Sequence, residues 1–234
     1  MTYINNLYTK DIIINDCLKL VFSNTESYPL LSEQNIIFIA GFTGSGKSTL
    51  IRRLVQNLNC FSEIPERRFI TLKGIIEPFV SYFNLKCDFN KRQDRIDIVK
   101  NYKKNIPEGI VFVLRHIRVI KDLPKGFIFD GIRGDEELKI VLETFKKAQI
   151  IILNASKETR LNRIVERKDT YDQINIAPTD TASKIIENDH KLHGNLNKSN
   201  SKRVININTE EMDQDEVFLT AYNWILNNNN NNCK

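Results

Sequence analysis

Short apolar runs alternate with amphipathic stretches along most of the chain. The apolar runs have the length and composition of buried strands, and the sequence places them at Asn35–Ala40, Arg68–Thr71, Phe127–Asp130, Gln149–Leu153 and Arg203–Ile207. Helical spacing of apolar residues lies between these runs, over residues 50–58, 74–105, 108–122, 135–147, 157–167, 181–192 and 213–226. Because strands that alternate with helices form βαβ units, we expect a three-layer α/β/α fold with a mostly parallel five-stranded sheet.

The pattern also divides the chain. The predicted domain covers residues 35–226, and residues 1–34 form an N-terminal extension before its first strand. Within this extension the apolar stretch Asp11–Phe22 fits a strand and a helix equally. Residues 227–234 contain six consecutive asparagines and are predicted to be a disordered tail.

A glycine-rich loop follows the first strand of the domain. Residues 41–49 match the pattern G-x-x-x-x-G-K-[ST] between a buried strand and a helix, which is the context that a P-loop requires. Glycines let backbone N–H groups surround a phosphate, Lys47 brings positive charge to the β- and γ-phosphates, and the Ser48 hydroxyl is a ligand for Mg²⁺. The sequence therefore predicts an ATP–Mg²⁺ site formed by Gly41, Thr43, Gly44, Ser45, Gly46, Lys47, Ser48 and Thr49.

Asp130 closes the apolar run Phe127–Asp130. Ligands of α/β proteins bind at the carboxyl ends of parallel strands, so Asp130 is predicted to hold Mg²⁺ directly or through water. The dipeptide Asp130–Gly131 is also a turn signal, and a turn or helix-capping role is the alternative.

Arginines supply a third signal. Arg133 follows Asp130 on the same loop and is predicted to clamp a second phosphate group, with a surface salt bridge to Glu136 or Glu137 as the alternative. Further along, three arginines spaced by three and four residues share one helix face: Arg160, Arg163 and Arg167. Three guanidinium groups on one face favour a nearby anion, and a solvated basic face is the alternative.

Together, the loop 41–49 and the segments 126–133 and 162–168 resemble the P-loop nucleotide kinases, such as adenylate kinase, dephospho-CoA kinase and the deoxynucleotide kinases. The resemblance covers about residues 35–208. It implies that Lys47 bridges the donor phosphates, that Arg133 binds the acceptor phosphate and that Arg163 packs on the donor adenine. It further implies a short lid at about residues 168–180, with Arg167 closing on the transferred phosphate.

The resemblance thus implies an ATP- and Mg²⁺-dependent phosphotransferase with four catalytic residues: Lys47, Asp130, Arg133 and Arg167. The expected acceptor is a nucleoside or deoxynucleoside monophosphate. Where adenylate kinases usually have a proline before the acceptor arginine, this chain has Ile132. Residues 60–125 contain the candidates for acceptor contacts, of which Arg68 and Arg115 are favoured over Arg67, Lys73, Arg92 and Arg95.

Composition adds little to this picture. A net charge of +5 suits anionic substrates of any kind. The four cysteines lack C-x-x-C spacing and are predicted to be reduced thiols. Since no apolar run approaches the roughly 20 residues of a membrane span and the N-terminus lacks a signal-peptide pattern, we expect a cytoplasmic protein without a membrane partner.

Two alternatives to a nucleotide kinase stay open. One is a kinase that acts on a coenzyme precursor or on nucleic-acid 5′-ends. The other is an ATP-binding regulatory or assembly ATPase, for which residues 1–34 could dock a partner. A small-molecule acceptor is favoured over a nucleic acid, and the oligomeric state is left open.

Overall fold

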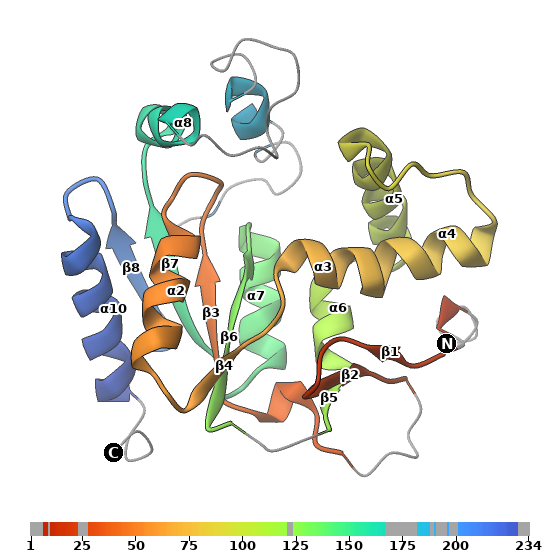
Figure 1. The fold of residues 1–234 in the computed structure, drawn as a ribbon, viewed down its shortest axis with the longest axis horizontal. Helices are drawn as coiled ribbons and strands as arrows, with labels where there is room; N and C mark the ends of the chain where they lie inside the picture. Colours follow the sequence, from red (N-terminus) through yellow and green to blue (C-terminus); the bar gives the residue numbers. More distant parts are fainter. Residues whose placement is uncertain are drawn as a thin grey trace.

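The computed structural model describes residues 7–8, 10–22, 28–120, 124–166, 182–187, 190, 196 and 201–228. Within these residues, one sheet has the strand order β4-β6-β3-β7-β8 (Figure 1). Its strands are β3 (Ile36–Ala40), β4 (Phe61–Glu63), β6 (Gly126–Ile132), β7 (Gln149–Asn154) and β8 (Val204–Asn208). Every neighbouring pair in this sheet is parallel. The predicted α/β fold with a five-stranded parallel sheet is confirmed.

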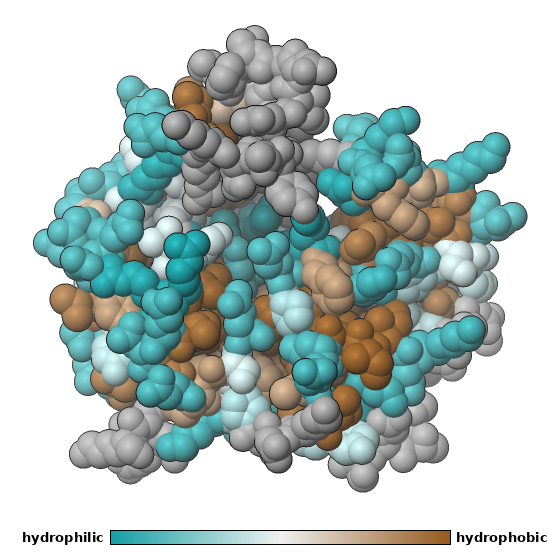
Figure 2. Space-filling view, in the orientation of Figure 1, coloured by the Kyte–Doolittle hydropathy of each residue, from teal (hydrophilic) through white to brown (hydrophobic). Residues whose placement is uncertain are grey.

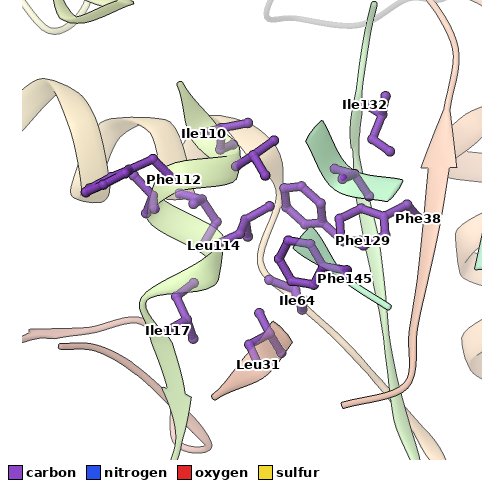
Figure 3. Close-up of a cluster of buried hydrophobic side chains, with 14 of the residues drawn as sticks. Leu31, Phe38, Ile64, Ile110, Phe112, Leu114, Ile117, Phe129, Ile132 and Phe145 are labelled. Atoms are coloured by element: carbon purple, nitrogen blue, oxygen red, sulfur yellow. The ribbon is translucent and has the colours of Figure 1, made fainter. Parts of the chain in front are cut away.

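Helices cover both faces of the sheet. On one face, α2 (Lys47–Asn57) and α10 (Gln214–Asn228) pack on a cluster that includes Ile37 and Ile39. On the other face, α6 (Ile110–Arg115) and α7 (Asp135–Thr144) pack on the cluster that contains Phe38 (Figure 3). Successive residues of β3 point to opposite faces because side chains alternate along a strand.

The larger cluster is aromatic at its centre. Phe38 lies edge-on to Phe129 and Phe145, with ring centroids 6.0 and 5.2 Å apart. Phe38, Phe129 and Phe145 are at most 1% exposed. This packing fixes β3 and β6 against α7, and the loops that leave the two strands carry the predicted site.

The chain between β4 and α6 forms a helical arm. It consists of α3 (Arg67–Thr71), the π-helical turn η2 (Leu72–Ile76), α4 (Glu77–Phe83) and α5 (Arg92–Asn105). Figure 1 shows α5 on one side of the carboxyl ends of the strands and α8 (Lys157–Glu166) on the other. Apolar side chains also reach the surface over α4 and α5 (Figure 2), where Phe83, Leu85 and Phe89 are 42%, 39% and 41% exposed.

The N-terminal residues join the domain through a second sheet. Strands β1 (Ile12–Ile13), β2 (Leu18–Leu20) and β5 (Ile117–Val119) are antiparallel and lie in the order β1-β2-β5. The short 3₁₀ helix η1 (Leu31–Glu33) follows. Leu18, Leu20 and Leu31 are fully buried in the same cluster as Phe38, so this part of the chain contributes to the main core.

Two predicted elements are wrong. Arg68–Thr71 is part of α3, and the strand beside β6 is β4, whose short and partly polar sequence hid it. The predicted helix 108–122 ends at Arg115 and gives way to β5. The five apolar residues 110–114 are all buried, so α6 is apolar all round, and the alternation of Ile117 and Val119 around Arg118 belongs to a strand.

Three other predictions fall partly on residues that the structure does not describe. The lid at 168–180, together with Arg167, lies outside the described residues. Of the predicted helix 181–192, residues 182–187 are described and helical. Of the predicted tail, residues 227–228 complete α10, and 229–234 lie outside the described part. No described helix combines the length and apolarity that a membrane crossing requires.

Candidate active site

The loop between β3 and α2 has a backbone that glycine alone adopts without strain. Gly41, Gly44 and Gly46 have φ values of 143°, 85° and 95°. Two of them also lack room for a side chain: a Cβ on Gly41 would lie 2.8 Å from the carbonyl oxygen of Leu153, and one on Gly44 would lie 2.8 Å from that of Arg160. The loop is therefore held in a tight turn against β7 and α8, as a phosphate-binding loop requires.

Lys47 opens α2 and lies against the loop. Its side chain is largely buried, with 6% of the residue exposed, and its Nζ donates to the carbonyl oxygen of Phe42 at 3.1 Å. Ser45 is 1% exposed, and within the described residues its Oγ has no hydrogen-bond partner. Ser48 is exposed on the first turn of α2, and Thr49 is half-buried beside it. The positive end of the α2 dipole and the Lys47 ammonium group therefore act on the same loop.

Asp130 lies beside the strand that enters this loop. It pairs in register with Ile39 of β3, one residue before that strand ends. Its Oδ1 is buried and, within the described part of the chain, accepts no hydrogen bond. Burial, and then the neighbouring charges of Glu66 and Asp130, raise the pKa of Glu63 above its ordinary value. The carboxylates of Glu63, Glu66 and Asp130 therefore lie close enough to interact at this edge of the sheet.

The described residues contain no cluster of three or more His, Cys, Asp or Glu side chains that could hold a metal alone. Mg²⁺ does not need one, because it usually keeps several waters and is bound by one or two protein oxygens plus substrate phosphates. The buried, unpartnered Oδ1 of Asp130 fits such a ligand.

Arg133 lies on the turn that joins β6 to α7, and a buried ion pair braces this turn. Arg67 of α3 donates to both carboxylate oxygens of Glu137, at 2.8 and 2.7 Å, and also to the carbonyl oxygen of Gly131. Lys103 of α5 lies 3.5 Å from the same carboxylate. The backbone N–H of Arg133 donates to Glu137 Oε2 at 3.3 Å. The turn that carries Arg133 is thus tied to α3 and α5.

The sequence did not identify this brace. Arg67 ranked below Arg68 and Arg115 as a candidate, and Glu137 was considered only as a surface partner of Arg133. Glu137 is in fact 4% exposed. The available signal was its spacing of four residues from Val141, which places a carboxylate on the buried face of α7. Arg115 forms an ion pair with Glu108 at 3.5 Å and lies over the ring of Phe112.

Two arginines of the α8 face contact the glycine loop or its surroundings. Arg160 is 3% exposed, and its guanidinium group lies over the ring of Phe42 at 5.1 Å, with Nη2 3.2 Å from His190 Nε2. Arg163 donates to the carbonyl oxygen of Gly44 at 3.4 Å, and to Oγ1 and the carbonyl oxygen of Thr209 at 2.9 and 2.6 Å. The solvated basic face is therefore wrong for this pair.

An open pocket lies between the glycine loop and the segment after β8. Its cavity volume is about 380 Å³. Polar residues of the loop and of α8 form one wall, and Met212, Leu50 and Val217 add apolar surface. The residues that line it include Gly44, Gly46, Thr49, Arg53, Arg163 and Thr209.

Comparison with known proteins agrees with this geometry. The model of a family described as "AAA domain" matches residues 37–188, a range that includes the glycine loop, Asp130, Arg133 and α8. No curated protein matches the chain.

The solved structures to which the chain is similar include three kinases. A gluconokinase from Sinorhizobium meliloti is 11% identical with a TM-score of 0.48, over 85% of this chain and 94% of that one. A shikimate kinase from Bacteroides thetaiotaomicron is 13% identical with a TM-score of 0.44, over 82% and 98%. A shikimate kinase from Acinetobacter baumannii, in complex with shikimate, is 13% identical with a TM-score of 0.41, over 86% and 97%. The family match over residues 37–188 includes the three segments on which the expected resemblance rests.

Proposed function

The chain belongs to the AAA domain family, and from this premise we propose that it is an ATP- and Mg²⁺-dependent phosphotransferase. It transfers the γ-phosphoryl group of ATP to a small molecule that already bears a phosphate, and a nucleoside or deoxynucleoside monophosphate is the expected acceptor.

The donor half consists of the glycine loop and the adjoining pocket. Backbone N–H groups of the loop and the ammonium group of Lys47 bind the phosphates of ATP, and the pocket beside Arg163 holds the adenosine. Arg163 is already oriented by Gly44 and Thr209, so its guanidinium plane is available to the base without further ordering.

Mg²⁺ is expected to be held by Asp130 and Ser48, together with the phosphates. When bound, it neutralises charge on the phosphates and orients them. Lys47 and the loop N–H groups supply the remaining stabilisation of the transferring phosphoryl group, so catalysis is mainly positioning and electrostatics.

The acceptor half carries the proposal, because a plain ATPase has no need for it. Arg67 and Lys103 bring two positive charges to the single buried carboxylate of Glu137, and the backbone N–H of Arg133 donates to the same carboxylate. Together with the Arg133 side chain on the same turn, these groups have a net positive charge. They lie at the carboxyl end of β6, directly after Asp130. This net positive charge suits an anionic acceptor whose phosphate accepts two hydrogen bonds from the guanidinium group of Arg133.

Phosphate transfer from γ-labelled ATP tests the proposal. The panel contains the ribo- and deoxyribonucleoside monophosphates, dephospho-CoA and a 5′-hydroxyl oligonucleotide. Gluconate and shikimate are included because a gluconokinase and a shikimate kinase are among the similar structures. We expect a labelled diphosphate product from one mononucleotide, and we expect Lys47→Ala to abolish it while leaving the fold intact.

Other outcomes of the panel decide between the alternatives. A labelled oligonucleotide or coenzyme product favours the kinase of another substrate class. ADP formation that is stimulated only by a protein or a nucleic acid, with no labelled acceptor, favours the regulatory ATPase. Unchanged turnover in Lys47→Ala contradicts the proposed donor site.

A further inference from the structure

Glu137 is a buried carboxylate at a point where the fold alone does not require one. It is 4% exposed in the first turn of α7, and it shares its helix face with Leu138 and Val141, which are buried. Asp135 and Glu136 precede it in the same turn and already give the helix N-terminus its favourable negative charge. Because burying a carboxylate is costly unless it is paired and hydrogen-bonded, Glu137 needs a reason beyond helix stability.

The contacts of Glu137 supply that reason. Its carboxylate accepts two hydrogen bonds from Arg67, lies 3.5 Å from Lys103 Nζ and accepts from the backbone N–H of Arg133. Arg67 also donates to the carbonyl oxygen of Gly131. Arg67 therefore bonds to the β6–α7 connection at Gly131, before the turn, and at Glu137, after it. Arg133 lies between these two residues.

The two side chains of this pair are well shielded. The Arg67 and Glu137 side chains are 12% and 6% exposed, whereas those of the Lys73–Glu77 pair on the same arm are both 37% exposed. Exposed pairs contribute little, while loss of one partner from a buried pair leaves an uncompensated charge. The Arg67–Glu137 pair is thus able to fix the geometry of the turn.

We propose that Glu137 is a positioning residue for acceptor binding, acting through Arg67 and the main chain of Arg133. This inference rests on the proposed function, in which Arg133 binds the phosphate of the acceptor. Loss of the Glu137 charge releases Arg67 and the Arg133 N–H together, so Arg133 no longer presents its guanidinium group in one place. The glycine loop and the adenosine pocket of the donor site are built on β3, α2 and α8.

Glu137→Gln tests the proposal, with Arg203→Gln as the matched control. Arg203 braces the opposite end of α7, where it donates to the carbonyl oxygens of Leu142 and Phe145 at 2.6 and 2.8 Å. Both variants therefore remove hydrogen bonds that attach α7 to the rest of the domain. Only Glu137→Gln releases the turn that carries Arg133.

Two readouts separate positioning from a merely structural role. For Glu137→Gln we expect the KM for the best mononucleotide of the panel to rise roughly tenfold, the effect of losing one hydrogen bond to a charged group, while the KM for ATP changes less than twofold. Amide exchange measured by mass spectrometry should accelerate in the peptide that covers residues 131–137. Arg203→Gln should lower the melting temperature but change neither the KM for the mononucleotide nor the exchange rate of residues 131–137.

The inference is overturned if both KM values move together in Glu137→Gln, or if residues 131–137 exchange at the wild-type rate. If Glu137→Gln does not fold, Arg67→Lys decides by the same two readouts, because it keeps the charge and loses the two-pronged contact. If wild-type protein phosphorylates nothing in the panel, the proposed function fails. Faster exchange of residues 131–137 then shows that Glu137 holds the turn, but its role towards an acceptor falls with the proposed function.

Discussion

Gly44 lies against the backbone of Arg160 so closely that a methyl group does not fit between them. A Cβ on Gly44 would lie 2.8 Å from the carbonyl oxygen of Arg160 and 3.0 Å from its Cβ. The glycine loop is therefore packed directly on α8, and the position of one depends on the other.

A pair of glycine variants measures this contact. Gly44 and Gly46 have similar φ values, 85° and 95°, so alanine at either position has a similar backbone cost of about 1–2 kcal/mol. A Cβ on Gly46 meets nothing within 4 Å, whereas one on Gly44 meets Arg160. We expect Gly44→Ala to be less stable than Gly46→Ala by a further ~1–3 kcal/mol in urea unfolding without nucleotide. Equal stabilities would mean that α8 simply moves aside.

Arg163 offers a test of the donor pocket. It bridges Gly44 and Thr209 and forms part of the pocket wall. We expect Arg163→Ala to raise the KM for ATP roughly tenfold, the effect of losing charged hydrogen bonds, with little change for the acceptor. Thr209→Val removes the hydroxyl to which Arg163 donates and keeps the carbonyl oxygen to which it also donates. The rise in the KM for ATP should therefore be smaller for Thr209→Val than for Arg163→Ala. A larger effect on the acceptor than on ATP would place Arg163 in the other half of the site.

Asp130 is the test of Mg²⁺ binding. Asp130→Asn keeps the size of the side chain and removes the charge from a buried oxygen that has no partner among the described residues. We expect a higher Mg²⁺ requirement and a fall in kcat of about 10²- to 10³-fold, as for loss of a transition-state electrostatic contact. Glu66→Gln is the control, since Glu66 is exposed, does not lie on β6 and, like Asp130, is close enough to Glu63 to raise the pKa of that residue. The same Mg²⁺ dependence in Asp130→Asn and wild type would remove Asp130 from the metal site.

Glu210 gives a pH prediction. Hydrogen bonds from the Ser156 and Thr159 hydroxyls, and from the Ser156 N–H, lower its pKa from 4.5 to about 2. Because the folded pKa lies below the unfolded one, the contribution of Glu210 to stability is present above about 4.5 and is lost as the pH falls towards 2. The melting temperature of wild type should exceed that of Glu210→Gln by a constant amount above pH 5. That difference should shrink between the two pKa values, and a constant difference down to pH 2 would contradict the assignment.

Features that depend on neighbouring residues could be predicted from the sequence. The strand before the glycine loop, the loop itself and the strand that carries Asp130 are local patterns of apolar residues and glycines, and the structure contains all three. The partners of the charged side chains at the site are not local. Arg67 meets Glu137 across 70 positions, and Arg163 meets Thr209 across 46.

The strands of the N-terminal sheet could not be predicted from the sequence for a related reason. Ile117 and Val119 fit a helix as well as a strand until their pairing with Leu20 and Leu18 is known. The apolar stretch 11–22 fits both structures for the same reason. A strand that is two or three residues long takes its identity from its partner, and periodicity within so few residues does not decide.

The strand order also constrains how the chain folds while it is being synthesised. β2 pairs with β1 and with β5, and β3 lies between β6 and β7, both of which come much later. The smaller sheet is complete only after Val119, about half-way along the chain, and the larger sheet only after Asn208. Until then Leu18, Leu20 and the residues of β3 lack their native partners, and such unpaired apolar strands expose a nascent chain to aggregation. We therefore expect its nascent N-terminal half to depend on chaperones more than the compact native domain suggests.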